Sequence, residues 1–125
     1  ADPVLRGPSD VAAVVAYFPP VDLRPIVGPN ERFPALDFQA ELAESISPIL
    51  YASADDPPTL LIHGDDDTLV DIRNSQIMYD ALVEQGVETE FITIPGAGHG
   101  FRGEDQTTAR AARLEWFVRH LVQER

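Results

Sequence analysis

The stretch that decides the fold is residues 57–70, PPTLLIHGDDDTLV. Two prolines precede a short run of threonine, leucine and isoleucine, and a histidine, a glycine and three aspartates follow it. A nearly continuous apolar run between turn-forming residues is typical of a strand that is buried on both faces of a parallel sheet. We therefore expect a strand over residues 59–62, with polar side chains directly beyond its carboxyl end.

Two more stretches have the same character. Residues 11–18, VAAVVAYF, are followed by two prolines, and residues 89–94, TEFITI, are followed by a proline and a glycine. Both are rich in apolar and β-branched residues, which favour strands. The sequence therefore predicts three strands, which pair in parallel if helices connect them.

The segments between and after these strands predict helices. Residues 72–85 carry an apolar face, with Asp71 as the expected N-cap and Gly86 as the terminator. Residues 104–124 repeat apolar side chains at helical spacing, and residues 38–46 give a weaker helical signal. The order predicts an α/β fold of three layers, a parallel sheet of about three strands in sequential order flanked by helices. We expect a single domain over residues 1–125, with an irregular excursion over residues 22–48.

Composition excludes several classes of function. The 125 residues include 9 basic and 21 acidic side chains, a net charge of −12, which repels nucleic acids and anionic lipids. Cysteine is absent, so disulfides, thiolate metal sites and a cysteine nucleophile are excluded. The longest apolar stretch is too short to span a membrane. We expect a soluble protein, with the cytoplasm favoured.

Chemically useful residues follow two of the expected strands. Asp67 comes after residues 59–62, and His99 comes after residues 89–94, between two glycines. Neighbouring parallel strands lie about 5 Å apart, so an acid and a histidine at their carboxyl ends can meet. A carboxylate that orients an imidazole is two-thirds of a Ser-His-Asp system. We expect the two side chains to come within about 3 Å of each other.

The motif HGxxDxxV at residues 63–70, followed by a helix, a strand and GxGHGF at residues 96–101, resembles the C-terminal part of an α/β-hydrolase. It is most similar to acetyl- and feruloyl-esterase-like members and to the related prolyl-oligopeptidase-type catalytic domains. The resemblance covers residues 11–122 and implies a partial α/β-hydrolase fold. It also implies that Asp67 is the catalytic acid and His99 the catalytic base. The implied reaction is hydrolysis of a small-molecule ester through an acyl-enzyme, without a cofactor or a metal.

The family pattern also includes a nucleophile elbow, Gly-x-Ser-x-Gly, which residues 1–125 do not contain. The family's order of serine, acid and histidine places the elbow before Ala1, so we expect a truncated hydrolase whose isolated chain has weak esterase activity or none. The alternative is a non-catalytic α/β fragment that acts as an oligomeric or complementing module. In either case we expect a homodimer through the strand edge from Val11 to Phe18, because no proline or charge interrupts this run.

Other interpretations of the same residues stay open. The three aspartates at residues 65–67 could bind a divalent cation, or they could be part of a phosphatase motif of the haloacid-dehalogenase type, although turn roles are expected for Asp65 and Asp66. His63 adjoins its strand and is expected to be structural. His120 is expected to be a packing or surface residue of the last helix. Phe101 could line an acyl pocket or belong to the core.

Overall fold

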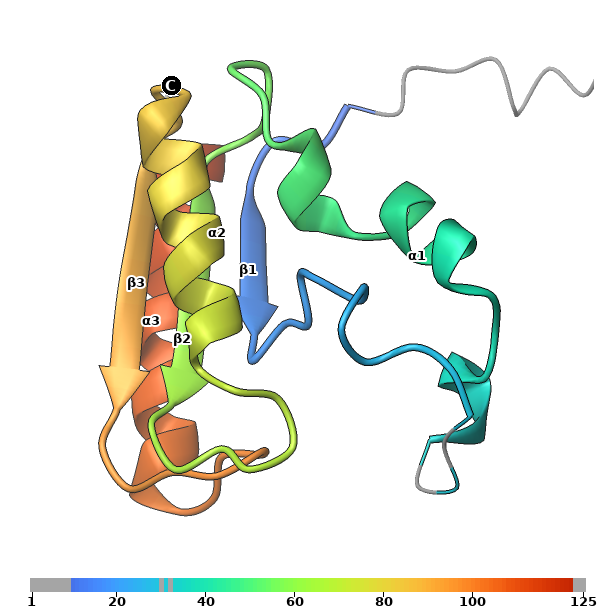
Figure 1. The fold of residues 1–125 in the computed structure, drawn as a ribbon. Coiled ribbons are helices and arrows are strands. Elements are labelled where there is room, and N and C mark those ends of the chain that lie inside the picture. Colours follow the sequence, from blue (N-terminus) through green and yellow to red (C-terminus); the bar gives the residue numbers. More distant parts are fainter. Residues whose placement is uncertain (1–9, 30, 32, 123–125) are drawn as a thin grey trace, which may run out of the picture.

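The computed structural model describes residues 10–29, 31 and 33–122. Its sheet consists of β1 (Val14–Tyr17), β2 (Thr59–Gly64) and β3 (Thr89–Ile94), in the order β1-β2-β3 with both pairs parallel. Helices α2 (Arg73–Glu84) and α3 (Glu104–Leu121) lie against the sheet, as Figure 1 shows. The expected fold class, a parallel α/β sheet in sequential order flanked by helices, is confirmed.

The central strand β2 is the core of the molecule, and all six of its residues are buried. Because side chains alternate along a strand, Leu60 and Ile62 pack with Trp116 of α3, while His63 faces Ser75 of α2. Both faces of β2 are therefore covered, which explains why its sequence is an apolar run rather than an alternating pattern.

Strand β1 is shorter than the predicted strand over residues 11–18. The strand begins at Val14, whose partner in the register is Thr59, the first residue of β2. Pro57 and Pro58 end the neighbouring strand there, so residues 11–13 have no partner to pair with. At the other end, Phe18 has a φ of +39°, which breaks the extended conformation after Tyr17.

Strand β2 is longer than the predicted strand over residues 59–62. It continues through His63 and Gly64, which pair with Thr93 and Ile94 of β3. The imidazole is polar, but both of its nitrogens are hydrogen-bonded, so burying it in the sheet is compatible with the apolar surroundings. At the start of α2 the N-cap is Ile72, not Asp71, although the Asp71 carboxylate still accepts a hydrogen bond from the Arg73 amide.

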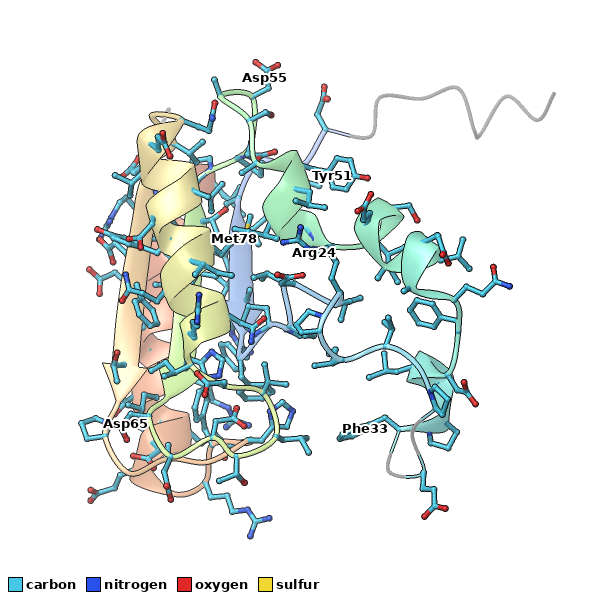
Figure 2. The ribbon with its side chains drawn as sticks, in the orientation of Figure 1. Arg24, Phe33, Tyr51, Asp55, Asp65 and Met78 are labelled. Atoms are coloured by element: carbon cyan, nitrogen blue, oxygen red, sulfur yellow. The ribbon has the colours of Figure 1, made fainter. Side chains whose placement is uncertain are left out.

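The segment predicted as an irregular excursion, residues 22–48, and the residues directly after it contain short elements. These are the 3₁₀ helices η2 (Pro34–Leu36) and η3 (Pro48–Tyr51) and, between them, helix α1 (Ala40–Ser45), which lies inside the weakly predicted helix of residues 38–46. The segment lies beside β1, on the side away from β3 (Figure 1). No helix of the described residues is long and apolar enough to cross a membrane. Figure 2 shows Asp65 at the carboxyl end of the sheet, opposite Asp55.

Candidate active site

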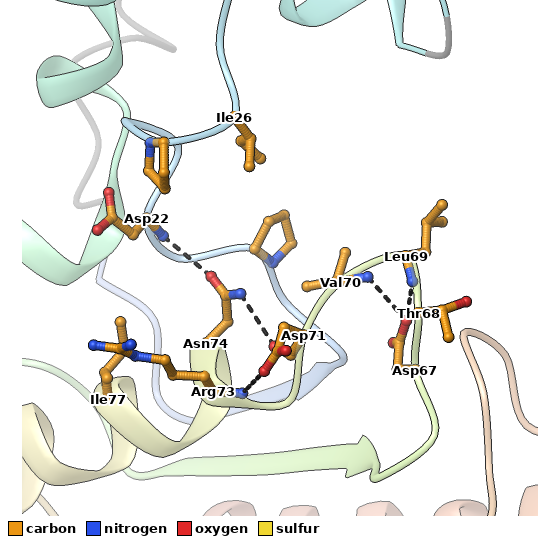
Figure 3. A pocket seen from close by; sticks show the side chains of 12 residues that line it. Asp22, Ile26, Asp67, Thr68, Leu69, Val70, Asp71, Arg73, Asn74 and Ile77 are labelled. Carbon is orange, nitrogen blue, oxygen red and sulfur yellow. Dashed lines mark hydrogen bonds between the residues drawn. The ribbon is translucent and has the colours of Figure 1, made fainter.

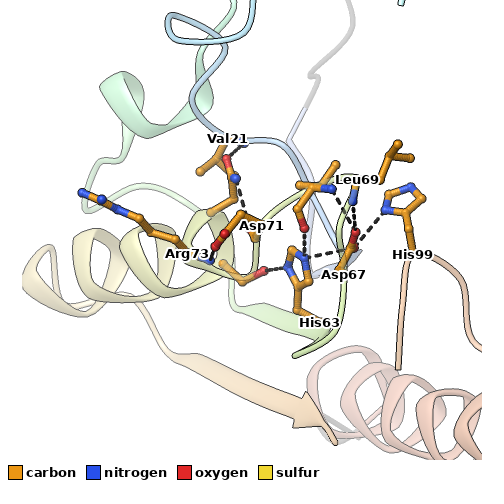
Figure 4. A network of polar contacts seen from close by, with 10 residues as sticks. Val21, His63, Asp67, Leu69, Asp71, Arg73 and His99 are labelled. Atoms are coloured by element: carbon orange, nitrogen blue, oxygen red, sulfur yellow. Dashed lines mark hydrogen bonds and ion pairs between the residues drawn. The ribbon is translucent and has the colours of Figure 1, made fainter. Parts of the chain in front are cut away.

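The Asp67 side chain, in the loop that follows β2, is completely shielded from solvent. Its Oδ1 accepts hydrogen bonds from the amides of Leu69 and Val70, both at 2.9 Å. Its Oδ2 accepts a hydrogen bond of 2.9 Å from Nδ1 of His99, in the loop after β3 (Figure 4). The contact expected from the strand ends is therefore present.

The ionised form of Asp67 is stabilised despite its burial. Burial alone raises the pKa of this carboxyl, but hydrogen bonds from the Val70 amide, His99 and the Leu69 amide lower it, as does charge on His99. The net effect places the pKa of Asp67 below the ordinary value for aspartate. The carboxylate is thus an anion at neutral pH, held in one orientation by fixed donors.

This anion determines which nitrogen of His99 carries the proton. A carboxylate oxygen only accepts, so the neutral imidazole has its proton on Nδ1 and a lone pair on Nε2. The His99 side chain is 31% exposed, whereas that of Asp67 is 0% exposed. The arrangement can therefore present a proton acceptor to solvent while the acid behind it stays buried.

A second histidine also approaches Asp67, and sequence reasoning did not find this contact. Nε2 of His63 lies 3.2 Å from the same Oδ2 and donates a hydrogen bond of 2.7 Å to the Val70 carbonyl. Since that carbonyl only accepts, the neutral ring has its proton on Nε2, and Nδ1 accepts from the Ser75 hydroxyl at 2.7 Å. His63 and Ser75 are both fully buried. They form the inner support of the Asp67 loop, away from solvent.

The loops after β2 and β3 come close together because residue 64 is glycine. A Cβ at Gly64 would lie 2.1 Å from the carbonyl oxygen of Ala97, closer than any side chain can approach. The Asp66 amide donates to this same carbonyl at 3.0 Å, and Asp65 Oδ1 accepts from the Gly96 amide at 2.7 Å. Asp65 and Asp66 thus have turn contacts, and these join the acid loop to the histidine loop.

Comparison with known proteins identifies the family. Residues 13–124 match the prolyl oligopeptidase family. The chain belongs to this family. Among curated relatives it is 32% identical over 79 residues to an uncharacterized peptidase YuxL of Bacillus subtilis, covering 60% of this chain and 12% of that protein. It is also 39% identical over 67 residues to a poly(3-hydroxyoctanoate) depolymerase of Pseudomonas fluorescens, covering 54% of this chain and 23% of that protein.

Solved structures agree with this membership. A truncated form of a carbohydrate esterase from gut microbiota has 31% identity and a TM-score of 0.70, over 90% of this chain and 45% of that one. A puromycin-hydrolyzing peptidase of Mycobacterium tuberculosis has 25% identity and a TM-score of 0.68, over 90% and 19%. The chain thus spans less than a quarter of the named curated relatives and less than half of these two structures. At the family level, these relatives indicate a hydrolase.

Cavities lie beside Asp67 in this family member. A cavity of about 510 Å³ is lined by the Asp67 loop, the start of α2 and residues of the segment after β1 (Figure 3). Next to it lies an apolar groove of about 780 Å³, with Leu23, Ile26, Phe33 and Leu69 in its walls. A separate hollow of about 350 Å³ is lined by His99 together with Arg102 and Asp105.

Three of the four described serines have hydroxyl partners other than His99. The hydroxyls of Ser45 and Ser47 donate to carbonyls of α1, at Leu42 and Ala43, and that of Ser75 bonds to His63. Ser9, the first serine of the sequence, lies outside the described residues. Ser53 is hydrogen-bonded through its backbone amide, to Asp56, and among the described residues no serine hydroxyl bonds to Nε2 of His99.

The remaining residues considered in the sequence lie apart from this contact. His120 packs against the Trp116 ring at 4.3 Å, and its Nε2 lies 3.7 Å from Glu88. Phe101 packs against the core cluster around β2. Among the described residues no group of three or more His, Asp or Glu side chains is placed to hold a metal ion. Within residues 65–67, one carboxylate turns to the Gly96 amide and another to His99.

Proposed function

We propose that this chain supplies the acid and the base of a serine-type carboxylic ester hydrolase, with Asp67 as acid and His99 as base. The observation that carries the proposal is the 2.9 Å hydrogen bond from exposed His99 to buried, ionised Asp67. In this reaction Nε2 of His99 takes the proton of a serine hydroxyl while its oxygen attacks the ester carbonyl carbon. Asp67 stabilises the imidazolium, which then protonates the leaving alkoxide.

The second half of the cycle uses the same pair. His99 removes a proton from water, the water oxygen attacks the acyl-enzyme, and the proton returns to the serine oxygen as the acid leaves. Residues 1–125 contain no Gly-x-Ser-x-Gly, so the proposal places the nucleophile and the amides of the oxyanion hole outside these residues. No cofactor or metal takes part.

A small-molecule ester is the proposed substrate class. The esterase similarity supports this choice, with 31% identity to the gut-microbiota carbohydrate esterase and a TM-score of 0.70. The apolar groove beside the Asp67 loop supports it as well, because a groove walled by Leu23, Ile26 and Leu69 suits an uncharged acyl or alcohol group.

The test is hydrolysis of p-nitrophenyl acetate by a polypeptide that contains residues 1–125 together with the segment preceding them in the reading frame. We expect His99→Ala and Asp67→Asn each to lower kcat by about 10³- to 10⁴-fold, as in other triads. The matched controls are His120→Ala and Asp66→Asn, which change a remote histidine and the exposed neighbouring aspartate and should keep the activity. A fluorophosphonate label on a serine before Ala1 would identify the nucleophile. Full activity of His99→Ala would refute the proposal.

A second candidate, a non-catalytic module that associates with itself, is favoured by one observation. Within the described part of the chain, β1 pairs with β2 on one side and with no strand on the other. An open strand edge is a template for pairing with another chain. We propose that residues 1–125 on their own form a homodimer through the edge from Val11 to Phe18. This candidate predicts dimers of residues 1–125 and no serine-dependent hydrolysis by the polypeptide that includes the preceding segment. The first candidate predicts that this longer polypeptide hydrolyses the ester.

A further inference from the structure

Phe18 has an unusual backbone conformation at the end of β1. Its φ is +39°, and it is the one non-glycine residue with positive φ in the described part of the chain. Bulky side chains rarely adopt this region, and a following proline such as Pro19 restricts the backbone further. Backbone strain of this kind persists where the surrounding structure imposes it, most often at functional sites.

The positive φ changes the direction of the Phe18 ring. In a regular strand Tyr17 and Phe18 would point to opposite faces of the sheet. Here both rings contact Phe101, at centroid distances of 5.4 Å and 5.3 Å. The turn at Phe18 therefore brings its ring to the carboxyl end of the sheet, on the side of Phe101.

There the Phe18 ring packs against His99. The two ring centroids are 4.2 Å apart and the planes are tilted by 52°, and among described ring pairs this is the one that includes His99. Gly98 and Gly100 flank His99 without side chains, and the His99 side chain is 31% exposed. The ring is also held by the hydrogen bond from its Nδ1 to Asp67.

We propose that Phe18 is a positioning residue for His99, whose ring holds the imidazole in the orientation that keeps Nδ1 on Asp67 and leaves Nε2 free. The catalytic consequence rests on the proposed function, but the positioning itself does not. A purely structural role would not require the strain, since an extended aromatic or aliphatic residue could close the end of β1. The positive φ of Phe18 is explained if its ring has to point toward His99.

The first test measures His99 directly, by NMR of the 125-residue chain labelled with ¹⁵N-histidine. We expect the Nδ1 proton of His99 to exchange with water about threefold to tenfold faster in Phe18→Leu, the equivalent of losing one aromatic contact. Phe18→Tyr keeps the ring and should restore the slow exchange. The matched control is Tyr17→Leu, which also removes a ring from Phe101 but not from His99. Phe18→Gly accepts the positive φ and serves if the leucine variant does not fold.

The second test uses the polypeptide that includes the preceding segment. There Phe18→Leu should lower kcat by a similar factor with KM unchanged, and it should alter the pH profile of kcat. Faster proton exchange without any ester hydrolysis in the parent protein would support the positioning role and contradict the proposed function. Equal exchange rates in the parent, Phe18→Leu and Phe18→Gly would overturn the positioning role, whether or not the protein hydrolyses esters.

Discussion

Asp67 has two imidazoles within 3.2 Å of one carboxylate oxygen, and their environments give them different roles. His63 is buried, with the Val70 carbonyl on one nitrogen and Ser75 on the other, so no solvent molecule or substrate reaches it. His99 is partly exposed, with one nitrogen on Asp67. Burial, rather than residue type, separates the supporting histidine from the candidate base.

The lowered pKa of Asp67 predicts that the free energy of unfolding depends on pH. A carboxyl whose pKa is lower in the folded state stabilises the fold above its unfolded pKa, and this contribution is lost as the pH falls through the folded value. We expect the free energy of unfolding to fall as the pH drops below about 4, the ordinary value for aspartate. Asp67→Asn should be less stable than the parent at pH 7, because its amide faces two imidazole N–H groups with donors of its own.

Urea unfolding at a series of pH values measures this effect. The difference in free energy between the parent and Asp67→Asn should shrink toward low pH, where the parent carboxyl is also neutral. Asp66→Asn is the control, since Asp66 is the exposed neighbour of Asp67 and the substitution makes the same chemical change. A difference that stays constant from pH 7 to the acid limit would contradict the lowered pKa of Asp67.

At the scale of elements, the approach of two loops depends on one missing side chain. The Cβ of Gly64→Ala would meet the Ala97 carbonyl at 2.1 Å, so the loops after β2 and β3 would have to separate. We expect this variant to lose about 2–4 kcal/mol of unfolding free energy, comparable to severe overpacking. The hydrogen bond from His99 to Asp67 spans these loops and should be lost with it.

Gly98→Ala is the matched control for this substitution. The nearest atom to its added Cβ is the Asp66 carbonyl oxygen at 3.8 Å, an ordinary contact, and its φ is not in the positive region. Thermal unfolding of both variants should show a large drop in Tm for Gly64→Ala and a small change for Gly98→Ala. Equal changes would mean that the close approach at Gly64 does not limit the loops.

The sequence predicted which helices and strands exist better than it predicted the residues at which they begin and end. Strand β3 over residues 89–94 was predicted with its observed bounds, because Pro95 and Gly96 end a clear run of apolar and β-branched residues. The start of β1 was not predicted, since it depends on where its partner β2 begins. The helix expected over residues 104–124 ends at Leu121 in the structure, and residues 123–125 lie outside the described part.

At the candidate active site, one contact could be predicted from the sequence and two could not. The meeting of Asp67 and His99 followed from their positions at neighbouring strand ends, which sequence order determines once the strands are parallel. The contacts of His63 with Ser75, and of Phe18 with His99, depend on tertiary packing and on one positive φ. Neither has a local sequence signal, although a histidine inside an apolar strand does indicate that a buried partner must exist.

For the molecule as a whole, we expect the side of β1 that pairs with no described strand to determine whether residues 1–125 associate with a second copy. The amides of Val14 and Phe18 donate to the carbonyls of Pro58 and Ile62 in and before β2. Because the strand has a two-residue period, the amides of Val15 and Tyr17 point away from β2, toward the side where no described strand pairs with β1 and where the segment after β1 lies (Figure 1). Unpaired amides next to apolar side chains favour pairing with a second strand.

A two-fold dimer is the simplest arrangement that satisfies this edge. Two copies of β1 that pair antiparallel would join two three-stranded sheets into one of six strands, and each copy would use the same surface. A specific contact should bury more than about 1,000 Å² in total. A polypeptide that also contains a preceding strand could cover the edge from within, so the prediction concerns residues 1–125 alone.

Light scattering on the purified 125-residue chain tests this prediction, and Val15→Pro tests its mechanism. Proline removes an amide that faces the free edge and leaves the bonds from Val14 and Phe18 to β2, as edge strands tolerate. We expect the parent to be a dimer and Val15→Pro to be a monomer. Val15→Ala, which loses packing but keeps the amide, should remain a dimer and so separates the effect of the edge from that of the side chain. A monomeric parent would refute edge pairing, and a dimeric Val15→Pro would show that copies meet through another surface, such as exposed Leu114 and Leu121 of α3.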